Sequence, residues 1–365
     1  MTATSTDRIL NFSAGPAVLP EPVLAKIRED VWNIDDSGIG VLEHSHRGPV
    51  IDRVFEEATE RTRRLAGIGD EHEVLFLQGG ASMQFGMIPM SFLPEGGTAD
   101  YPDTGTWTSK AIKEARKFGN VNVAFDGSAC SYDHCPSADE LSLSDDASYL
   151  HYCSNNTIYG TRYALPPSSS APLICDASSE MFARPWPFAD HALVYAGAQK
   201  NLGPSGVALV IIRKDFMETA GRETIDLLDY RKHAKAGSRL NTPPVFGVYA
   251  MNLVMAWIEE QGGLAKMADH NDAKAKTIYD AIDGSGGFYR GHAKSCCRST
   301  MNVTFRLPDE GLEKTFVEET KAAGMSGLKG HRSVGGIRAS IYNAFPSAGC
   351  DALAAFMADF AARNG

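Results

Sequence analysis

The stretch Tyr195-Ala-Gly-Ala-Gln-Lys200-Asn-Leu-Gly-Pro-Ser-Gly206 lies between two apolar runs, His191–Ala196 and Val207–Ile212. These runs predict buried strands, and the small residues between them predict a turn. The turn carries one lysine, Lys200, whose amine would lose contact with water between the strands. Desolvation lowers the pKa of a lysine toward the neutral amine, the form that attacks a carbonyl carbon. Lys200 is therefore a candidate for Schiff-base attachment of a carbonyl cofactor. A solvated loop lysine is the alternative interpretation.

The surrounding pattern predicts the fold class. From about residue 70 to residue 215, apolar strand-like runs alternate with helix-like segments. This alternation predicts an α/β domain with a mostly parallel mixed sheet flanked by helices, and with functional groups at the carboxyl ends of the strands. Helices are expected at residues 246–261 and 264–282, and a strand–helix–strand–helix pattern follows. We therefore predict a large domain over residues 16–262 and a smaller C-terminal α+β domain over residues 263–365, which the N-terminal segment 1–15 joins.

Composition narrows the class of protein. The chain has 365 residues, of which 43% are hydrophobic and 22% charged, and its formal net charge is −10. These values are ordinary for a globular enzyme, and the negative charge argues against nucleic acid or an anionic membrane as a partner. No run of 18 apolar residues occurs, and the first seven residues lack the apolar core of a signal peptide.

The cysteines argue against both disulfides and metal. Seven cysteines are scattered along the chain, an odd number that favours reduced thiols and a cytoplasmic location. Cys130 and Cys135 flank His134, but no second pair of ligands follows at the spacing of a zinc site, so we predict no metal. The neighbouring Cys296 and Cys297 are interpreted as packing residues.

Three further segments suggest a cofactor site around Lys200. Gly79-Gly80-Ala81-Ser82 follows a predicted strand and opens a predicted helix, where backbone N–H groups bind phosphate; an ordinary strand–helix turn is the alternative. Asp176 ends the apolar run Leu173–Asp176, where its carboxylate could pair with a pyridinium nitrogen or cap the next helix. Trp107 follows the turn at residues 103–106, where its indole could lie on a cofactor ring or pack in the core.

The motifs taken together resemble the phosphoserine aminotransferases, which are pyridoxal-phosphate enzymes of fold type I in the aspartate aminotransferase superfamily. The resemblance runs almost end to end. It rests on the order and spacing of Asn11–Pro16, Ser45–Gly48, Gly79–Ser82, Ala198–Gly203, Asn241–Pro244 and Gly330–Ser340.

The resemblance assigns a role to each site residue. It implies that Lys200 holds pyridoxal 5'-phosphate and that Asp176 pairs with the ring nitrogen. The implied cofactor contacts are Ala81, Ser82, Trp107, Thr157, Asp176, Gln199, Lys200, Asn241 and Thr242. The implied substrate contacts are Arg338 at the α-carboxylate and His46, Arg47, His331 and Arg332 at the distal anion. A homodimer with shared active sites is implied, because Asn241, Thr242, His46 and Arg47 would come from the partner subunit.

The implied reaction is a ping-pong transamination of serine biosynthesis. Glutamate becomes 2-oxoglutarate, and 3-phosphohydroxypyruvate becomes phosphoserine. In bacteria such enzymes commonly also act in pyridoxine biosynthesis, where they transfer an amino group between 4-phosphohydroxy-threonine and the corresponding oxo-acid. Two departures affect substrate contacts only: Ala14 stands where some members have serine, and Ser82 where some have arginine. The alternatives are another fold-type-I aminotransferase, such as the alanine–glyoxylate type, and a catalytically silent binding protein of the same fold.

Overall fold

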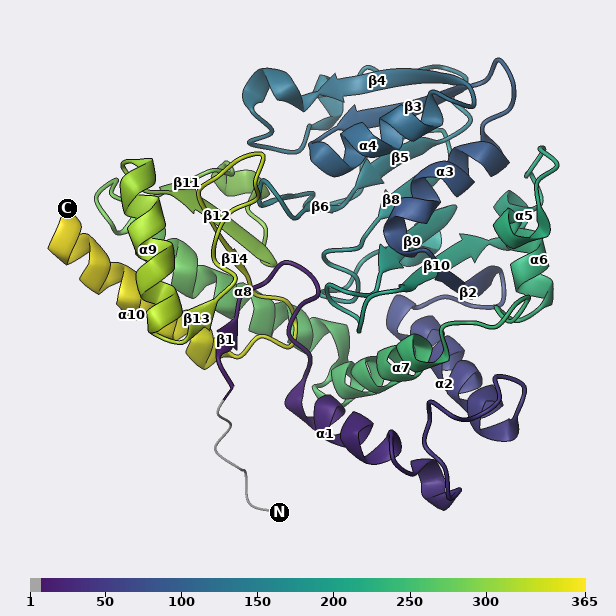
Figure 1. Cartoon of the computed structure of the whole chain (residues 1–365). Coiled ribbons are helices and arrows are strands. Elements are labelled where there is room, and N and C mark those ends of the chain that lie inside the picture. The colour runs from purple at the N-terminus through teal and green to yellow at the C-terminus, as the bar shows by residue number, and fades with distance from the viewer. Residues whose placement is uncertain (1–7) are drawn as a thin grey trace.

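The computed structural model describes residues 8–365 as a large α/β part and a smaller C-terminal part (Figure 1). A seven-stranded sheet forms the centre of the large part. Its order is β2 (His72–Gln78), β10 (Val207–Arg213), β9 (Leu193–Gly197), β8 (Leu173–Asp176), β5 (Leu150–Cys153), β3 (Thr98–Asp103) and β4 (Asn120–Asp126). Only β10 runs antiparallel to its neighbours.

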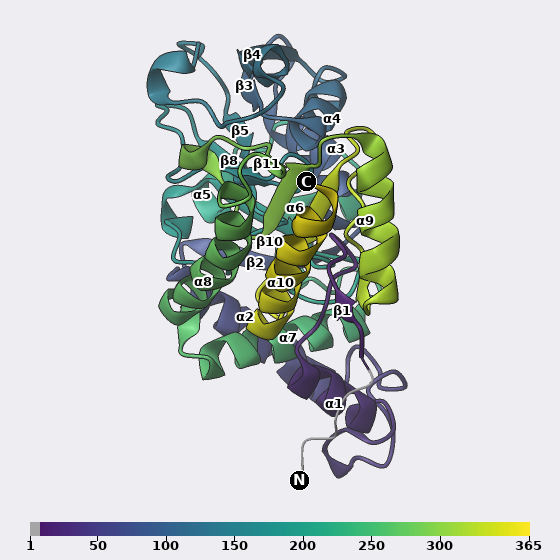
Figure 2. The same ribbon diagram turned by 90° about the vertical axis from the view of Figure 1, so that its left-hand side faces the viewer.

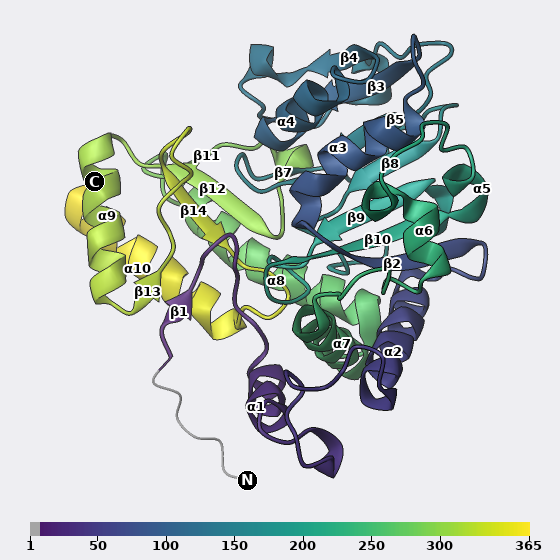
Figure 3. The same ribbon diagram turned by 45° about the vertical axis from the view of Figure 1, so that its right-hand side comes forward.

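Helices cover both faces of this sheet (Figure 3). Alternation along β2 explains why: Leu75 and Leu77 belong to one apolar cluster, whereas Val74 and Phe76 belong to another. The first cluster includes side chains of α3 (Gly80–Phe92) and α4 (Thr106–Ala115). The second includes side chains of α1 (Glu21–Asp30), α2 (Pro49–Ala66) and α7 (Val245–Glu260). Two short helices, α5 (Lys214–Met217) and α6 (Tyr230–Lys235), lie beside β10 and β2.

The C-terminal part is built on a three-stranded antiparallel sheet. Its order is β11 (Arg290–Gly291), β12 (Asn302–Arg306) and β14 (Ile337–Ser340). The helices of this part are α8 (Gly263–Asp283), α9 (Glu310–Ala322) and α10 (Ser347–Asn364), and α8 runs alongside α10 (Figure 2). The N-terminal strand β1 (Leu10–Asn11) pairs in parallel with β13 (Met325–Ser326). The hairpin of β6 (Asn155–Asn156) and β7 (Thr161–Arg162) lies between the two parts.

Helix α8 connects the two apolar cores. Met267, near the N-terminus of α8, packs in the core of the large part, whereas Ala275, Ile278 and Ile282 pack in the C-terminal core. A division of the chain at residue 262 therefore falls at the start of a helix that contacts both cores. The domain bounds given above stay a prediction.

The predicted mostly parallel mixed sheet is confirmed. The antiparallel direction of β10 follows from the short turn after β9, since a parallel neighbour would need a crossover of a dozen residues or more. The carboxyl ends of β2, β3, β5, β8 and β9 consequently lie along one edge of the sheet. No helix within residues 8–365 combines the length and apolar character that a membrane crossing requires.

Replacement of Phe316 tests the packing of the C-terminal core. Its ring is fully buried, and its centroid lies 5.2 Å from that of Phe360 and 6.0 Å from that of Phe305. Phe316→Ala should lower the free energy of unfolding by about 3–5 kcal/mol, because it leaves a cavity among aromatic rings. Urea unfolding measures this change. The exposed Lys314 lies on the same helix, and Lys314→Ala should cost less than about 0.5 kcal/mol. Equal losses in the two variants would contradict the packing described.

Candidate active site

A cavity of about 390 Å³ opens at the carboxyl ends of β2, β8 and β9. Its lining includes six of the residues predicted to bind the cofactor. These are Ala81, Ser82, Trp107, Asp176, Gln199 and Lys200. They come from four segments that are far apart in the sequence, and the sheet brings them together because its strands end at one edge.

Lys200 is half-buried and projects from the turn after β9 into the cavity. Its Nζ donates a hydrogen bond of 2.6 Å to Oγ1 of Thr157 and lies 5.2 Å from the ring centroid of Trp107. Desolvation by the surrounding protein lowers the pKa of this lysine, while the charge of Asp176 acts in the opposite direction. The amine is thus closer to its neutral, nucleophilic form than a lysine on the surface.

Asp176 is a buried carboxylate that has no ion-pair partner in the described part of the chain. Its residue is 4% exposed, and Oδ1 accepts a hydrogen bond of 2.9 Å from the backbone N–H of Ser178. Among residues 8–365, no lysine, arginine or histidine lies within ion-pair distance of it. Burying such a charge is costly unless a cation compensates it. The site is therefore suited to a cationic group of a bound molecule.

The N-terminus of α3 forms another wall of the cavity. Gly79 and Gly80 precede Ala81 with φ of 86° and 61°, in the left-handed region that glycine adopts without strain. The first N–H groups of a helix lack partners within the helix, and the helix dipole adds positive potential there. This end of α3 can therefore bind an anion such as a phosphate.

Trp107 is the second residue of α4, and Asp103 accepts hydrogen bonds from the start of this helix. The Asp103 Oδ1 atom accepts hydrogen bonds from the backbone N–H of Gly105 at 3.1 Å and from the hydroxyls of Thr108 and Ser109 at 2.9 Å each. The buried indole Nε1 of Trp107 has no hydrogen-bond partner in the described part of the chain. The hydrogen bonds of Asp103 thus fix the start of α4, and the Trp107 side chain on it lines the cavity.

Arg338 joins the C-terminal part to the cavity. It lies on β14, and its Nη1 donates a hydrogen bond of 3.4 Å to the backbone oxygen of Thr157. Its buried Nε has no partner within residues 8–365, and burial lowers the pKa of the guanidinium. Burial also lowers the pKa of His331, and the charges of Arg338, Arg332 and Lys110 lower it further. Arg338, Arg332 and Lys110 thus bring positive charge to His331, and Arg338 also acts on Lys200.

Comparisons with known proteins agree with this geometry. The family described as aminotransferase class-V matches residues 9–353. A phosphoserine aminotransferase of Herpetosiphon aurantiacus is 52% identical, over 98% of this chain and 99% of its own length. The structure of phosphoserine aminotransferase from Bacillus circulans subsp. alkalophilus has a TM-score of 0.96 and 49% identity, covering 99% of this chain and all of that one. A pyridoxal-phosphate-bound phosphoserine aminotransferase from Trichomonas vaginalis has a TM-score of 0.91 and 39% identity, over 96% and 100% of the two chains.

The chain belongs to the phosphoserine aminotransferase family. The resemblance found in the sequence is thereby confirmed, and the chain is an enzyme of the aminotransferase class. The prediction of fold type I is confirmed as well, since the solved structures of the family superimpose on nearly the whole chain.

Eight residues that the family resemblance implies are absent from the lining of the Lys200 cavity, namely Thr157, Asn241, Thr242, His46, Arg47, His331, Arg332 and Arg338. Asn241 lines a separate groove of about 220 Å³, and the backbone oxygen of Thr242 accepts a hydrogen bond of 2.7 Å from Nε2 of Gln78. His46 and Arg47 precede α2, and the Arg47 side chain is exposed. Their roles at the site stay predictions.

Several residues of the cavity were not predicted from the sequence. The lining residues without a predicted role are Gly15, Pro16, Phe85, Ser178, Ser205 and Gly206, whereas Gly79 and Gly80 belong to the turn that was predicted to bind phosphate. Ser178 follows Asp176 by two positions and Ser205 lies within the lysine turn, so their proximity to predicted residues was an available signal. Gly15 belongs to the Asn11–Pro16 motif of the family resemblance but was given no role, and Phe85 gave no local signal, because only tertiary packing brings it to the cavity.

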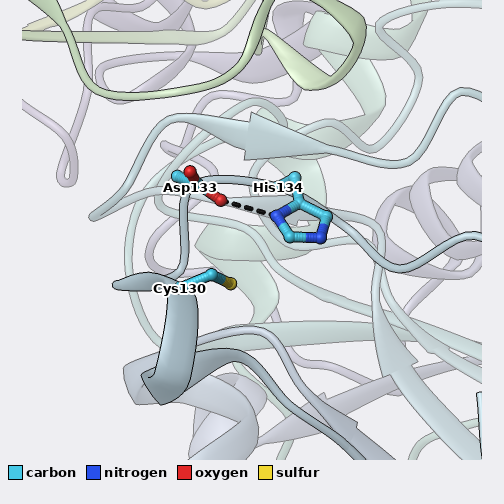
Figure 4. Close-up of side chains that lie close together, drawn as sticks. All are labelled: Cys130, Asp133 and His134. Atoms are coloured by element: carbon cyan, nitrogen blue, oxygen red, sulfur yellow. Dashed lines mark hydrogen bonds and ion pairs between the residues drawn. The ribbon is translucent and has the colours of Figure 1, made fainter. Parts of the chain in front are cut away.

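A second group of side chains lies away from this cavity. Cys130, Asp133 and His134 place their potential ligand atoms within 4.8 Å of one another (Figure 4). The ammonium of Lys294 lies 3.4 Å from Oδ1 of Asp133 and 3.1 Å from Nδ1 of His134. Glu140 contacts the other ring nitrogen at 3.1 Å. The aspartate thus already has a cationic partner in the protein, and the expectation of no metal stays a prediction.

The electrostatic coupling between Asp176 and Lys200 can be measured. Asp176→Asn removes a negative charge that favours the ammonium, so the pKa of Lys200 should fall further. Reductive methylation of the cofactor-free protein with formaldehyde, followed by peptide mass spectrometry, reports the pH at which Lys200 becomes reactive. That pH should be lower than for exposed lysines, and lower again in the variant. Asp190→Asn, at an exposed position, should leave it unchanged. A profile that moves to higher pH in Asp176→Asn would contradict this coupling.

Proposed function

We propose that the chain uses pyridoxal 5'-phosphate to transfer the amino group of glutamate to 3-phosphohydroxypyruvate, giving 2-oxoglutarate and phosphoserine. The observation that carries this proposal is the arrangement in which Lys200 and Arg338 both bind Thr157, at 2.6 Å and 3.4 Å, beside the cavity. It brings an amine of lowered pKa next to a guanidinium that can hold a carboxylate. The names of the family members support the choice of substrates.

The residues of the cavity fit pyridoxal phosphate. The N-terminus of α3 at Ala81 and Ser82 would bind its phosphate, with Gln199 beside it. The buried Asp176, which has no ion-pair partner among the described residues, would pair with the protonated ring nitrogen. Trp107 would lie against the ring and Thr157 near its hydroxyl. Lys200 would hold the carbonyl carbon.

Bound pyridoxal phosphate would supply a reactive carbonyl and a sink for the electrons of the bond broken at the α-carbon. The protein supplies the proton transfer. Lys200 would take the proton from the α-carbon of the amino donor, and the lowering of its pKa by desolvation favours the unprotonated amine that this task needs. The hydroxyl of Thr157 orients Nζ of Lys200. Asp176 would keep the ring nitrogen protonated, because its negative charge favours a cation there.

Two cationic sites correspond to the two anionic ends of each substrate. Arg338 would bind the α-carboxylate, because a guanidinium offers paired donors to a carboxylate. His331 and Arg332, seven and six residues earlier in the chain, would bind the distal phosphate or carboxylate. Both heads accept similar donors, so one site serves glutamate and phosphoserine. Ser82 leaves this site without the arginine of some family members, so His331 and Arg332 carry more of it.

We also propose a homodimer in which Asn241, Thr242, His46 and Arg47 complete the active site of the partner subunit. These residues do not line the Lys200 cavity of their own chain. Asn241 instead lines an apolar groove with Leu227 and Met83, whose side chains are exposed. Exposed apolar side chains around a groove are typical of an interface, and a two-fold axis would present the same groove twice. The seven cysteines are free thiols, which supports a reducing, cytoplasmic location.

The substrate assignment can be tested with two arginine variants. Arg332→Ala should reduce kcat/KM for phosphoserine by roughly 30-fold or more, since a charge-assisted contact to a bound anion is lost. It should affect alanine much less, because alanine has no distal anion. Arg338→Ala should impair both amino acids, since both carry an α-carboxylate. Steady-state kinetics with each donor measure these losses. Equal losses for both donors in both variants would show that the two anion sites are misassigned.

Shared active sites can be tested by complementation between subunits. Lys200→Ala and Arg47→Ala homodimers should each have little activity, since each lacks a residue needed at both sites. Mixed dimers should regain up to about half of the activity per dimer, because one of their two sites carries neither change. Differently tagged subunits allow the mixed dimer to be purified and assayed. A purified mixed dimer no more active than the two homodimers would contradict sites shared in this way.

A further inference from the structure

Lys274 is a fully buried lysine that the proposed reaction does not use. It lies on α8, and its residue is 1% exposed. Two polar residues, Asn271 and Lys274, interrupt the buried apolar face of this helix, one turn apart. Burial lowers the pKa of Lys274 to about 7. Keeping an amine in such a place is costly, so its contacts must compensate.

Carbonyl oxygens surround the amine. Nζ donates hydrogen bonds to the backbone oxygens of Tyr342 at 2.7 Å, Ile341 at 3.0 Å and Phe345 at 3.2 Å, and Asn343 O lies at 3.5 Å. All four oxygens belong to residues 341–345, the segment that directly follows β14. An ammonium can satisfy several carbonyl groups that no neighbouring strand pairs. Lys274 therefore fixes the path of the chain where it leaves β14.

This segment lies between the two halves of the candidate active site. Upstream, β14 carries Arg338. Downstream, the backbone N–H of Asn343 donates a hydrogen bond of 3.0 Å to Oδ1 of Asn201, the residue after Lys200. Asn271 supports the same turn, because its Nδ2 donates to Oδ1 of Asn343 at 2.8 Å.

We propose that Lys274 is a positioning residue that sets the placement of Arg338 relative to Lys200, through its hydrogen bonds to residues 341–345. This inference rests on the proposed function of Arg338 as the α-carboxylate clamp. Without the ammonium of Lys274, residues 341–345 would lose the hydrogen bonds that hold them between β14 and the turn that carries Lys200. The α-carboxylate of any amino donor would then be held at a poorer position for proton transfer to Lys200.

Lys274→Met tests the proposal in the cofactor-loaded enzyme, since methionine keeps much of the length and removes the donors. We expect a folded protein with unchanged cofactor absorbance and a kcat/KM for glutamate that is lower by roughly 10- to 100-fold. The control is Lys276→Met on the same helix, where the side chain is 73% exposed. It should behave as the parent enzyme does.

A double-mutant cycle with Arg338→Ala separates positioning from general stability. If Lys274 acts through Arg338, adding Lys274→Met to Arg338→Ala should cost little more, because the clamp is already gone. The same factor of loss in both backgrounds, or a Lys274→Met activity within about twofold of the control, would overturn the proposal.

Asn271→Ala covers the case in which Lys274→Met does not fold. It removes one hydrogen bond to the same segment. We therefore expect a smaller loss of kcat/KM for glutamate, and we expect this loss to vanish in the Arg338→Ala background. An additive loss would overturn the proposal. An unmodified enzyme that transfers no amino group at all would instead contradict the proposed function, which keeps the two failures distinguishable.

Discussion

The hydrogen bonds of Thr157 hold the two halves of the candidate site together. The hydroxyl of Thr157 accepts from Lys200 of the large part, and its backbone oxygen accepts from Arg338 of the C-terminal part. Thr157 follows β6 in the hairpin between the parts, and this hairpin also bonds to the C-terminal sheet, where Oγ1 of Thr304 donates to Tyr159 O at 2.8 Å. A displacement of either part would therefore separate the amine from the guanidinium.

The sequence predicted the large part of the fold well because its signals are local. The short continuous apolar run Val207–Ile212, rich in β-branched residues and bounded by a turn, favours a buried strand, and the structure places it between β2 and β9. The helix expected at residues 246–261 forms at Val245–Glu260. What could not be predicted from local sequence is the order of the strands in the sheet and the pairing of β1 with β13, because such pairings depend on tertiary packing.

The residues of the candidate site likewise include some that have a local sequence signal and some that do not. Lys200, Asp176 and the Gly79–Ser82 turn were predicted because each ends or follows a strand, and the strands end at one edge. Arg338 was assigned by family resemblance alone, since nothing in its neighbourhood indicates that β14 lies against Thr157. Lys274 was missed altogether. A lysine one turn after Asn271 on an amphipathic helix resembles a solvated side chain, and only the carbonyl oxygens of residues 341–345 explain its burial.

The electrostatics of the cavity connect these observations. Desolvation acts on Lys200, His331 and Arg338 alike and lowers the pKa of each. The described residues around His331 contribute cations, namely Arg332, Arg338 and Lys110, which lower its pKa further. A substrate with two anionic ends reverses these effects, because each negative charge stabilises the protonated form of its neighbours. If His331 belongs to the distal anion site, as proposed, binding of the substrate and protonation of His331 would favour each other. A donor with only one anionic end would provide less of this compensation.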